Sequence, residues 1–101
     1  MAACRVFDYN FAEQAVLDLL KKTEIELNVQ LQISDVLEKD FGWIFLFDSK
    51  EYVETGNNSS RLAGNSPLIF DKLDGVIYIT GTSDTLDAYV EQYRRGIKTP
   101  A

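Results

Sequence analysis

The sequence predicts an α+β fold: a four-stranded antiparallel sheet with one helix from each end of the chain, in the order α-β-β-β-β-α. Two observations lead to this prediction. Near both ends of the chain apolar residues recur with a helical period, whereas between them the period is two and turn residues separate short apolar runs. With 101 residues, 46% of them hydrophobic, the chain suits a single domain, residues 1–101, with one core.

The first helix is predicted to begin near Asn10, which forms the pattern of a capping box with Glu13. Lys21 and Lys22 suit the negative end of a helix dipole, so the helix should span about three to four turns. Its apolar residues fall on one stripe, which consists of Phe11, Ala15, Val16, Leu19 and Leu20.

Four strands are predicted after this helix. They correspond to residues 29–34, 42–47, 67–70 and 76–80. In the second strand the apolar residues occupy both faces, with Trp43, Phe45 and Phe47 on one and Ile44 and Leu46 on the other. A strand of this kind is covered on both sides or sits centrally in the sheet.

The connections between these elements differ in kind. Asp74 and Gly75 supply the positive φ of a tight hairpin between the third and fourth strands. The long connection from Ser49 to Ser66 should begin with a short helical turn and is the segment expected to carry function. We also expect it to cover part of the sheet face that the helices leave open.

The last helix should be capped by Thr82 or Ser83. Its apolar stripe consists of Leu86, Tyr89, Val90 and Tyr93. Because each helix has one apolar stripe and both chain ends can meet at the same layer, the two helices are predicted to pack on one face of the sheet.

The composition of the chain limits the classes of function that it can have. The chain carries 16 acidic residues against 10 basic ones, a net charge of −6, which disfavours nucleic acid and anionic membranes and favours a basic partner. It has no histidine, so the usual general base and the Ser-His-Asp arrangement are absent. A single cysteine, Cys4, excludes an internal disulfide and a thiolate metal cluster. We therefore expect no enzyme activity, no metal and no cofactor, and interpret the carboxylates as mainly solvating.

The chain shows no signal sequence and no apolar run that could cross a membrane, so a cytoplasmic location is expected. Three segments also carry a resemblance: GWIFLFDSKEYVETG from Gly42, RLAGNSPLIFDKLDGVIYITGT from Arg61, and LDAYVEQY from Leu86. Over residues 29–93 the sequence resembles the YrhB-like, immunity protein 35 domain family of bacteria. The resemblance implies a domain of polymorphic toxin systems that binds and neutralises a cognate toxin. One branch of the family is chaperone-like, so a holdase for unfolded or partly folded proteins is the alternative.

A toxin-facing patch is predicted where the second strand ends and the third begins. Many toxins that act on nucleic acid have basic clefts, and acidic side chains would speed their capture through long-range attraction. Tyr52 would serve as an aromatic anchor, or alternatively pack over the sheet edge. The predicted toxin-binding residues are Asp48, Glu51, Tyr52, Glu54 and Asp71.

Overall fold

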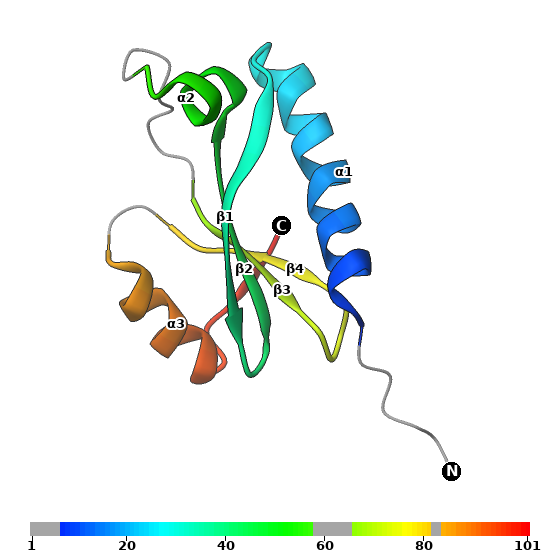
Figure 1. Ribbon diagram of the computed structural model, residues 1–101. Helices are drawn as coiled ribbons and strands as arrows, with labels where there is room; N and C mark the ends of the chain where they lie inside the picture. Colours follow the sequence, from blue (N-terminus) through cyan, green and yellow to red (C-terminus); the bar gives the residue numbers. More distant parts are fainter. Residues whose placement is uncertain (1–6, 58–65, 82–83) are drawn as a thin grey trace.

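A five-stranded antiparallel sheet in the order β1-β2-β3-β4-β5 forms the centre of the computed structural model, which describes residues 7–57, 66–81 and 84–101 (Figure 1). The elements are α1 (Tyr9–Leu27), β1 (Leu31–Lys39), β2 (Gly42–Ser49), α2 (Lys50–Thr55), β3 (Leu68–Asp71), β4 (Ile77–Ile79), α3 (Leu86–Arg94) and β5 (Thr99–Pro100). All four strand pairs are antiparallel. The predicted α+β class and antiparallel sheet are confirmed, but the sheet has five strands instead of four.

Helix α1 is longer than predicted and begins at a different cap. Asp8 is the N-cap and its carboxylate accepts a hydrogen bond from the Phe11 amide (2.8 Å), so the capping box at Asn10 was wrong. The helix runs for 19 residues and ends at Asn28, whose φ of 56° is the left-handed conformation that asparagine tolerates. Its fully buried residues are Ala12, Val16 and Leu20, whereas Phe11 is 51% exposed.

A bulge in β1 explains why the first strand was predicted too short. The pairing of β1 with β2 is irregular between Ile33 and Asp35, and it resumes with Val36 opposite Phe45. One inserted residue shifts the alternation of side chains by one position. The alternation of apolar and polar residues that predicted this strand is therefore lost after Ser34, although the strand continues to Lys39.

The two long helices lie on opposite faces of the sheet, so their prediction on one face was wrong (Figure 1). On one side, α1 packs over a cluster that includes Phe45 and Phe70. On the other, α3 packs over a cluster that includes Ile44 and Ile69. The physical reason is in β2 itself, whose two apolar faces each need a cover. Helix α3 provides the cover that was assigned to the long connection.

The remaining connections agree in part with the sequence. Gly75 has a φ of 70°, which confirms the predicted turn, and α2 confirms the helical start of the long connection. Thr85 caps α3 by accepting a hydrogen bond from the Ala88 amide (3.2 Å). Residues 58–65 and the predicted caps Thr82 and Ser83 lie outside the described residues. The missed strand β5 has two residues, too few for any periodicity to reveal.

Candidate functional site

Four of the five predicted site residues lie together at one end of the sheet. Asp48 is buried near the end of β2, and the short helix α2 that follows carries Glu51 and Glu54, both exposed, and the half-buried Tyr52. The Ser49 hydroxyl caps α2 by accepting a hydrogen bond from the Tyr52 amide (3.1 Å). We call Glu51, Tyr52 and Glu54 the α2 patch.

Helix α2 is also tied to the start of the edge strand. The Lys50 amide donates to the Gln30 carbonyl just before β1 (2.8 Å), and α2 contacts both β1 and β2. The α2 patch is therefore an acidic surface held on a fixed support beside the start of β1, as Figure 1 shows.

Asp71 lies elsewhere. It is the last residue of β3 and pairs with Gly42, the first residue of β2, whereas Asp48 is near the other end of that strand. Six residues of strand separate the two positions by about 20 Å. The expected clustering of Asp71 with the α2 patch was wrong because Asp71 ends β3 instead of beginning it, and the end of the antiparallel β3 lies beside the beginning of β2.

The structure gives Asp71 a clear structural environment. It is 6% exposed; one carboxylate oxygen accepts a hydrogen bond from the Tyr93 hydroxyl and the other accepts from the Leu73 amide (2.8 Å). A second such pair lies beside it, where the Tyr78 hydroxyl donates to Asp74 (2.5 Å). These two pairs tie α3 and β4 to the β3–β4 turn. Sequence patterns do not reveal such pairs, because their partners are brought together only by the fold.

Both phenols are held in the protonated form. Burial, followed by the hydrogen bond to Asp71, raises the pKa of Tyr93. The hydrogen bond to Asp74, followed by burial, raises the pKa of Tyr78 to about 12. A phenol with a raised pKa is a poor proton donor at neutral pH. The cluster therefore suits a structural role better than acid-base catalysis.

This cluster predicts an alkaline loss of stability. The folded-state pKa of Tyr78 is about 12 against an ordinary value of 10.0, so the stabilisation is complete below pH 10 and is lost as the pH rises toward 12. One such phenol lowers the free energy of unfolding by at most about 1.4 kcal/mol per pH unit in this range. Urea unfolding at pH 8, 10, 11 and 12, followed by circular dichroism, should show a shallower decline for Tyr78→Phe than for the wild type. Equal declines would contradict this assignment.

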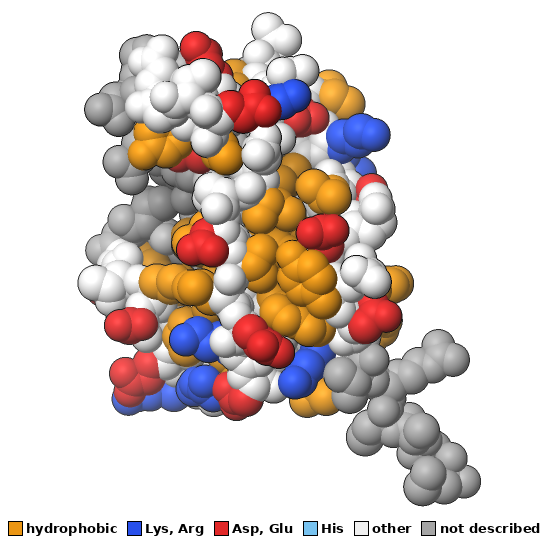
Figure 2. Space-filling model, in the orientation of Figure 1, with side chains coloured by type: hydrophobic (Ala, Val, Ile, Leu, Met, Phe, Trp, Pro, Cys, Tyr) orange, Lys and Arg blue, Asp and Glu red, His pale blue; other side chains and the backbone are white. Residues whose placement is uncertain are grey.

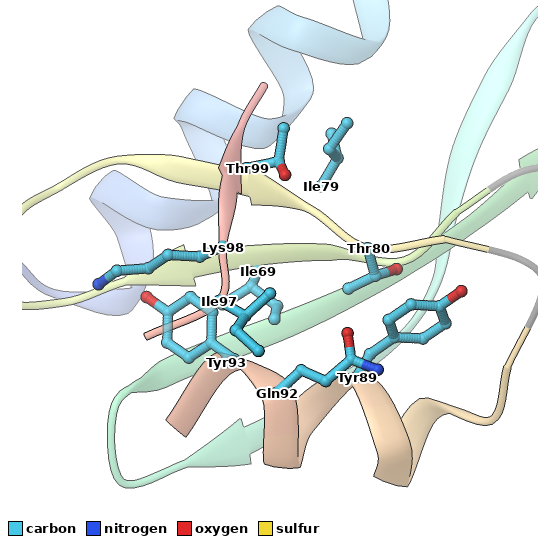
Figure 3. A pocket seen from close by; sticks show the side chains of 9 residues that line it. All are labelled: Ile69, Ile79, Thr80, Tyr89, Gln92, Tyr93, Ile97, Lys98 and Thr99. Carbon is cyan, nitrogen blue, oxygen red and sulfur yellow. The ribbon is translucent and has the colours of Figure 1, made fainter. Parts of the chain in front are cut away.

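A small hollow lies between α3 and the β4–β5 edge of the sheet (Figure 3). Its volume is about 100 Å³, well below the several hundred Å³ of typical small-molecule sites. Ile69, Ile79 and Ile97 form its apolar part, and Tyr89, Gln92 and Lys98 are among its polar residues. The hollow has room for one side chain of a partner and is too small for a cofactor.

Among the residues that the structure describes, no group of three or more His, Cys, Asp or Glu residues could hold a metal ion. Within the same ranges, no helix combines the length and the apolar character needed to cross a membrane.

Comparison with known proteins finds a matching family and a similar bacterial protein. The family model described as "Immunity protein 35" matches residues 12–95, from α1 through α3. The "Uncharacterized protein YrhB" of Escherichia coli (strain K12) is 46% identical over 52 residues, which cover 52% of this chain and 55% of that protein. The match thus spans about half the length of this relative. No solved structure matches the chain.

Proposed function

Because this chain belongs to the immunity protein 35 family, we propose that it binds a cognate protein toxin in the cytoplasm and neutralises it without catalysing a reaction. The observation that carries the proposal is the family match, which extends over residues 12–95 and so includes the whole of α1–β1–β2–β3–β4–α3 apart from the first turn of α1. The chain's net charge of −6 further supports a basic partner.

The α2 patch is the proposed point of first encounter with the toxin. Glu51 and Glu54 are exposed and belong to one short helix that is fixed to β1 and β2. Exposed charges of this kind attract an oppositely charged partner over about a Debye length, 8–10 Å near physiological salt. Tyr52 is half-buried, so part of its side chain stays accessible to a partner. Asp48 and Asp71 are buried, so any influence they have on the toxin would be indirect.

Co-expression with the toxin domain encoded beside this chain's gene tests the proposal. We expect the chain to restore growth of cells that the toxin alone arrests, and to co-purify with it as an equimolar complex. In vitro, inhibition should be complete at a ratio of one chain per toxin, because a binder acts stoichiometrically. Continued arrest despite soluble, folded chain would contradict neutralisation, and full inhibition at a small fraction of that ratio would indicate an enzyme instead.

One observation favours the holdase alternative. At the end of α1 and just beyond it, Ile25, Leu27 and Val29 are 82%, 53% and 37% exposed. Exposed apolar side chains of this kind can hold unfolded clients. A holdase would suppress the aggregation of heat-unfolded citrate synthase at high and low salt alike. An immunity protein should leave that aggregation unchanged.

A further inference from the structure

The edge strand β1 has an open side. Among the described residues it pairs with β2 alone, so every second residue of β1 directs its backbone N–H and C=O groups away from the sheet. In Figure 1 neither α1 nor α2 crosses this outer edge. From Asp35 to Lys39 the pairing with β2 is regular, which gives about 16 Å of uninterrupted edge.

An apolar strip accompanies this edge on the side of α1. Tyr9, Ile33 and Val36 are half-buried and pack against the core cluster that contains Phe45, and the Tyr9 ring stacks on Phe45 with a centroid distance of 6.0 Å. Figure 2 shows apolar side chains gathered between α1 and β1, with acidic side chains on both sides of them. Helix α1 and strand β1 thus leave the edge of the core between them open to solvent.

The strip continues as a hollow toward the C-terminal part of α1. This hollow has a volume of about 270 Å³ and its apolar lining is Leu17, Leu20 and Leu31. Leu17 is 40% exposed. We call the strip and the hollow together the α1–β1 groove.

The rim of the groove is acidic. Its carboxylates are Glu13, Asp18 and Glu24 on α1 and Glu38 on β1, which pairs with Trp43 on the same face as Val36. One lysine, Lys21, also lies along it, so four acids against one base leave a formal charge of −3.

None of these carboxylates forms an ion pair among the described residues. The three on α1 accept hydrogen bonds from neutral groups: the Tyr9 hydroxyl (3.2 Å), the Gln14 side-chain amide (2.9 Å) and the Leu31 backbone amide (2.6 Å). The ion pairs within the described residues, Arg94–Asp40 and Arg95–Glu91, both involve α3 instead. The groove therefore keeps a net negative charge beside an apolar floor.

We propose that the α1–β1 groove binds an extended, cationic segment of the partner toxin, which pairs with β1 as a sixth strand. Identification of the partner as the toxin rests on the proposed function. Backbone pairing with the free edge gives affinity in this mode, and alternate side chains of the added strand read the surface beside it. On the side of α1, Lys or Arg residues of the segment would lay their aliphatic stems on the strip and reach the rim carboxylates with their charged ends, while the alternate residues face the other side of the sheet.

A second copy of this chain is a poor occupant. Antiparallel pairing of two β1 edges would bring together two acidic rims, each with a formal charge of −3. Like charges brought together in this way destabilise the pairing. The acidic rim and the bulge at Ile33–Asp35 thus guard the edge against self-association, while a basic segment gains from the same charges.

The test uses two synthetic ten-residue peptides, one of alternating Lys and Val and one of alternating Glu and Val. Each is titrated into the ¹⁵N-labelled full chain and followed by NMR. We expect the Lys–Val peptide to shift the backbone amides of β1 and of the facing side of α1, and the Glu–Val peptide to shift none. Equal responses to the two peptides, no response up to several millimolar, or shifts centred on α2 or α3 would overturn the proposal.

Two matched pairs of variants locate the binding. Leu17→Lys places a cation in the groove, whereas Leu73→Lys makes the same change at a residue that is 62% exposed in the β3–β4 turn. Glu38→Lys is matched by Asp84→Lys, because each replaces an exposed carboxylate by a lysine, the first on the groove rim and the second just before α3. We expect about a fivefold or larger loss of Lys–Val peptide affinity for each groove variant, equivalent to about 1 kcal/mol, and little change for its control. Equal losses within a pair would contradict the assignment.

The same variants separate this inference from the proposed function. If the toxin is neutralised by the wild type and equally well by Leu17→Lys and Glu38→Lys, the groove is not the docking site and neutralisation stands. If the Lys–Val peptide binds the groove but no toxin is neutralised, the groove binds cationic strands and the immunity function fails.

Discussion

Replacing Gly42 by alanine should destabilise this protein more than any other single methyl addition that we consider. Gly42 begins β2 with a φ of 147°, and a Cβ atom added there would lie 1.9 Å from the Phe70 carbonyl oxygen. The neighbouring atoms are backbone atoms of β3 and of the residue after it, so no side-chain rotation can relieve the contact. We expect a loss of about 3–5 kcal/mol in the free energy of unfolding, a large part of the 5–15 kcal/mol typical of a domain.

Gly56→Ala is the matched control for this variant. Gly56 also has a positive φ, 72°, but an added Cβ would meet nothing within 4 Å. It should therefore lose only about 1 kcal/mol for the left-handed conformation. Urea unfolding of both variants measures the difference. If Gly42→Ala is no less stable than Gly56→Ala, the close approach of β2 and β3 at this point is not as the structure has it.

Reversing the two charges of the α2 patch should slow toxin capture by about tenfold or more at low salt. In Glu51→Lys/Glu54→Lys the exposed carboxylates become cations that repel a basic partner at long range. The difference should shrink as salt is added, because the Debye length falls from about 30 Å at 0.01 M to about 8 Å at 0.15 M. Stability should change by no more than about 0.5 kcal/mol, since both side chains are exposed. Stopped-flow association with the toxin across a salt series measures the effect.

The matched control is Asp84→Lys/Asp87→Lys, which makes the same change in net charge on exposed residues at the start of α3. It should slow association much less. Equal slowing by the two double variants would mean that overall charge, and not the α2 patch, attracts the toxin. The groove variants should differ from both, because lost contacts in a docked complex raise the dissociation rate more than they lower the association rate.

Local pattern was sufficient for much of the secondary structure. The periodicity of the sequence predicted α1, α3 and four of the strands, because burial of one face imposes a repeat on each element. The alternation of Trp43, Ile44 and Phe45 correctly indicated a strand covered on both sides. Gly75 correctly marked a turn, since its φ of 70° is a requirement of the local backbone. The family resemblance over residues 29–93 is confirmed by the family match over residues 12–95.

The arrangement of these elements depended on tertiary structure. The face of the sheet that a helix covers depends on how all apolar surfaces of the chain are buried together. Here both faces of β2 are apolar, and α1 and α3 cover one face each. The same holds for the candidate sites. The antiparallel return of β3 separated Asp71 from the α2 patch and paired it with Tyr93, 22 residues away in sequence. The α1–β1 groove likewise depends on the fold, because it forms where α1 and the edge strand β1 pack on a shared core and leave one side of that core uncovered. Such contacts are set by packing across the chain, and no local repeat records them.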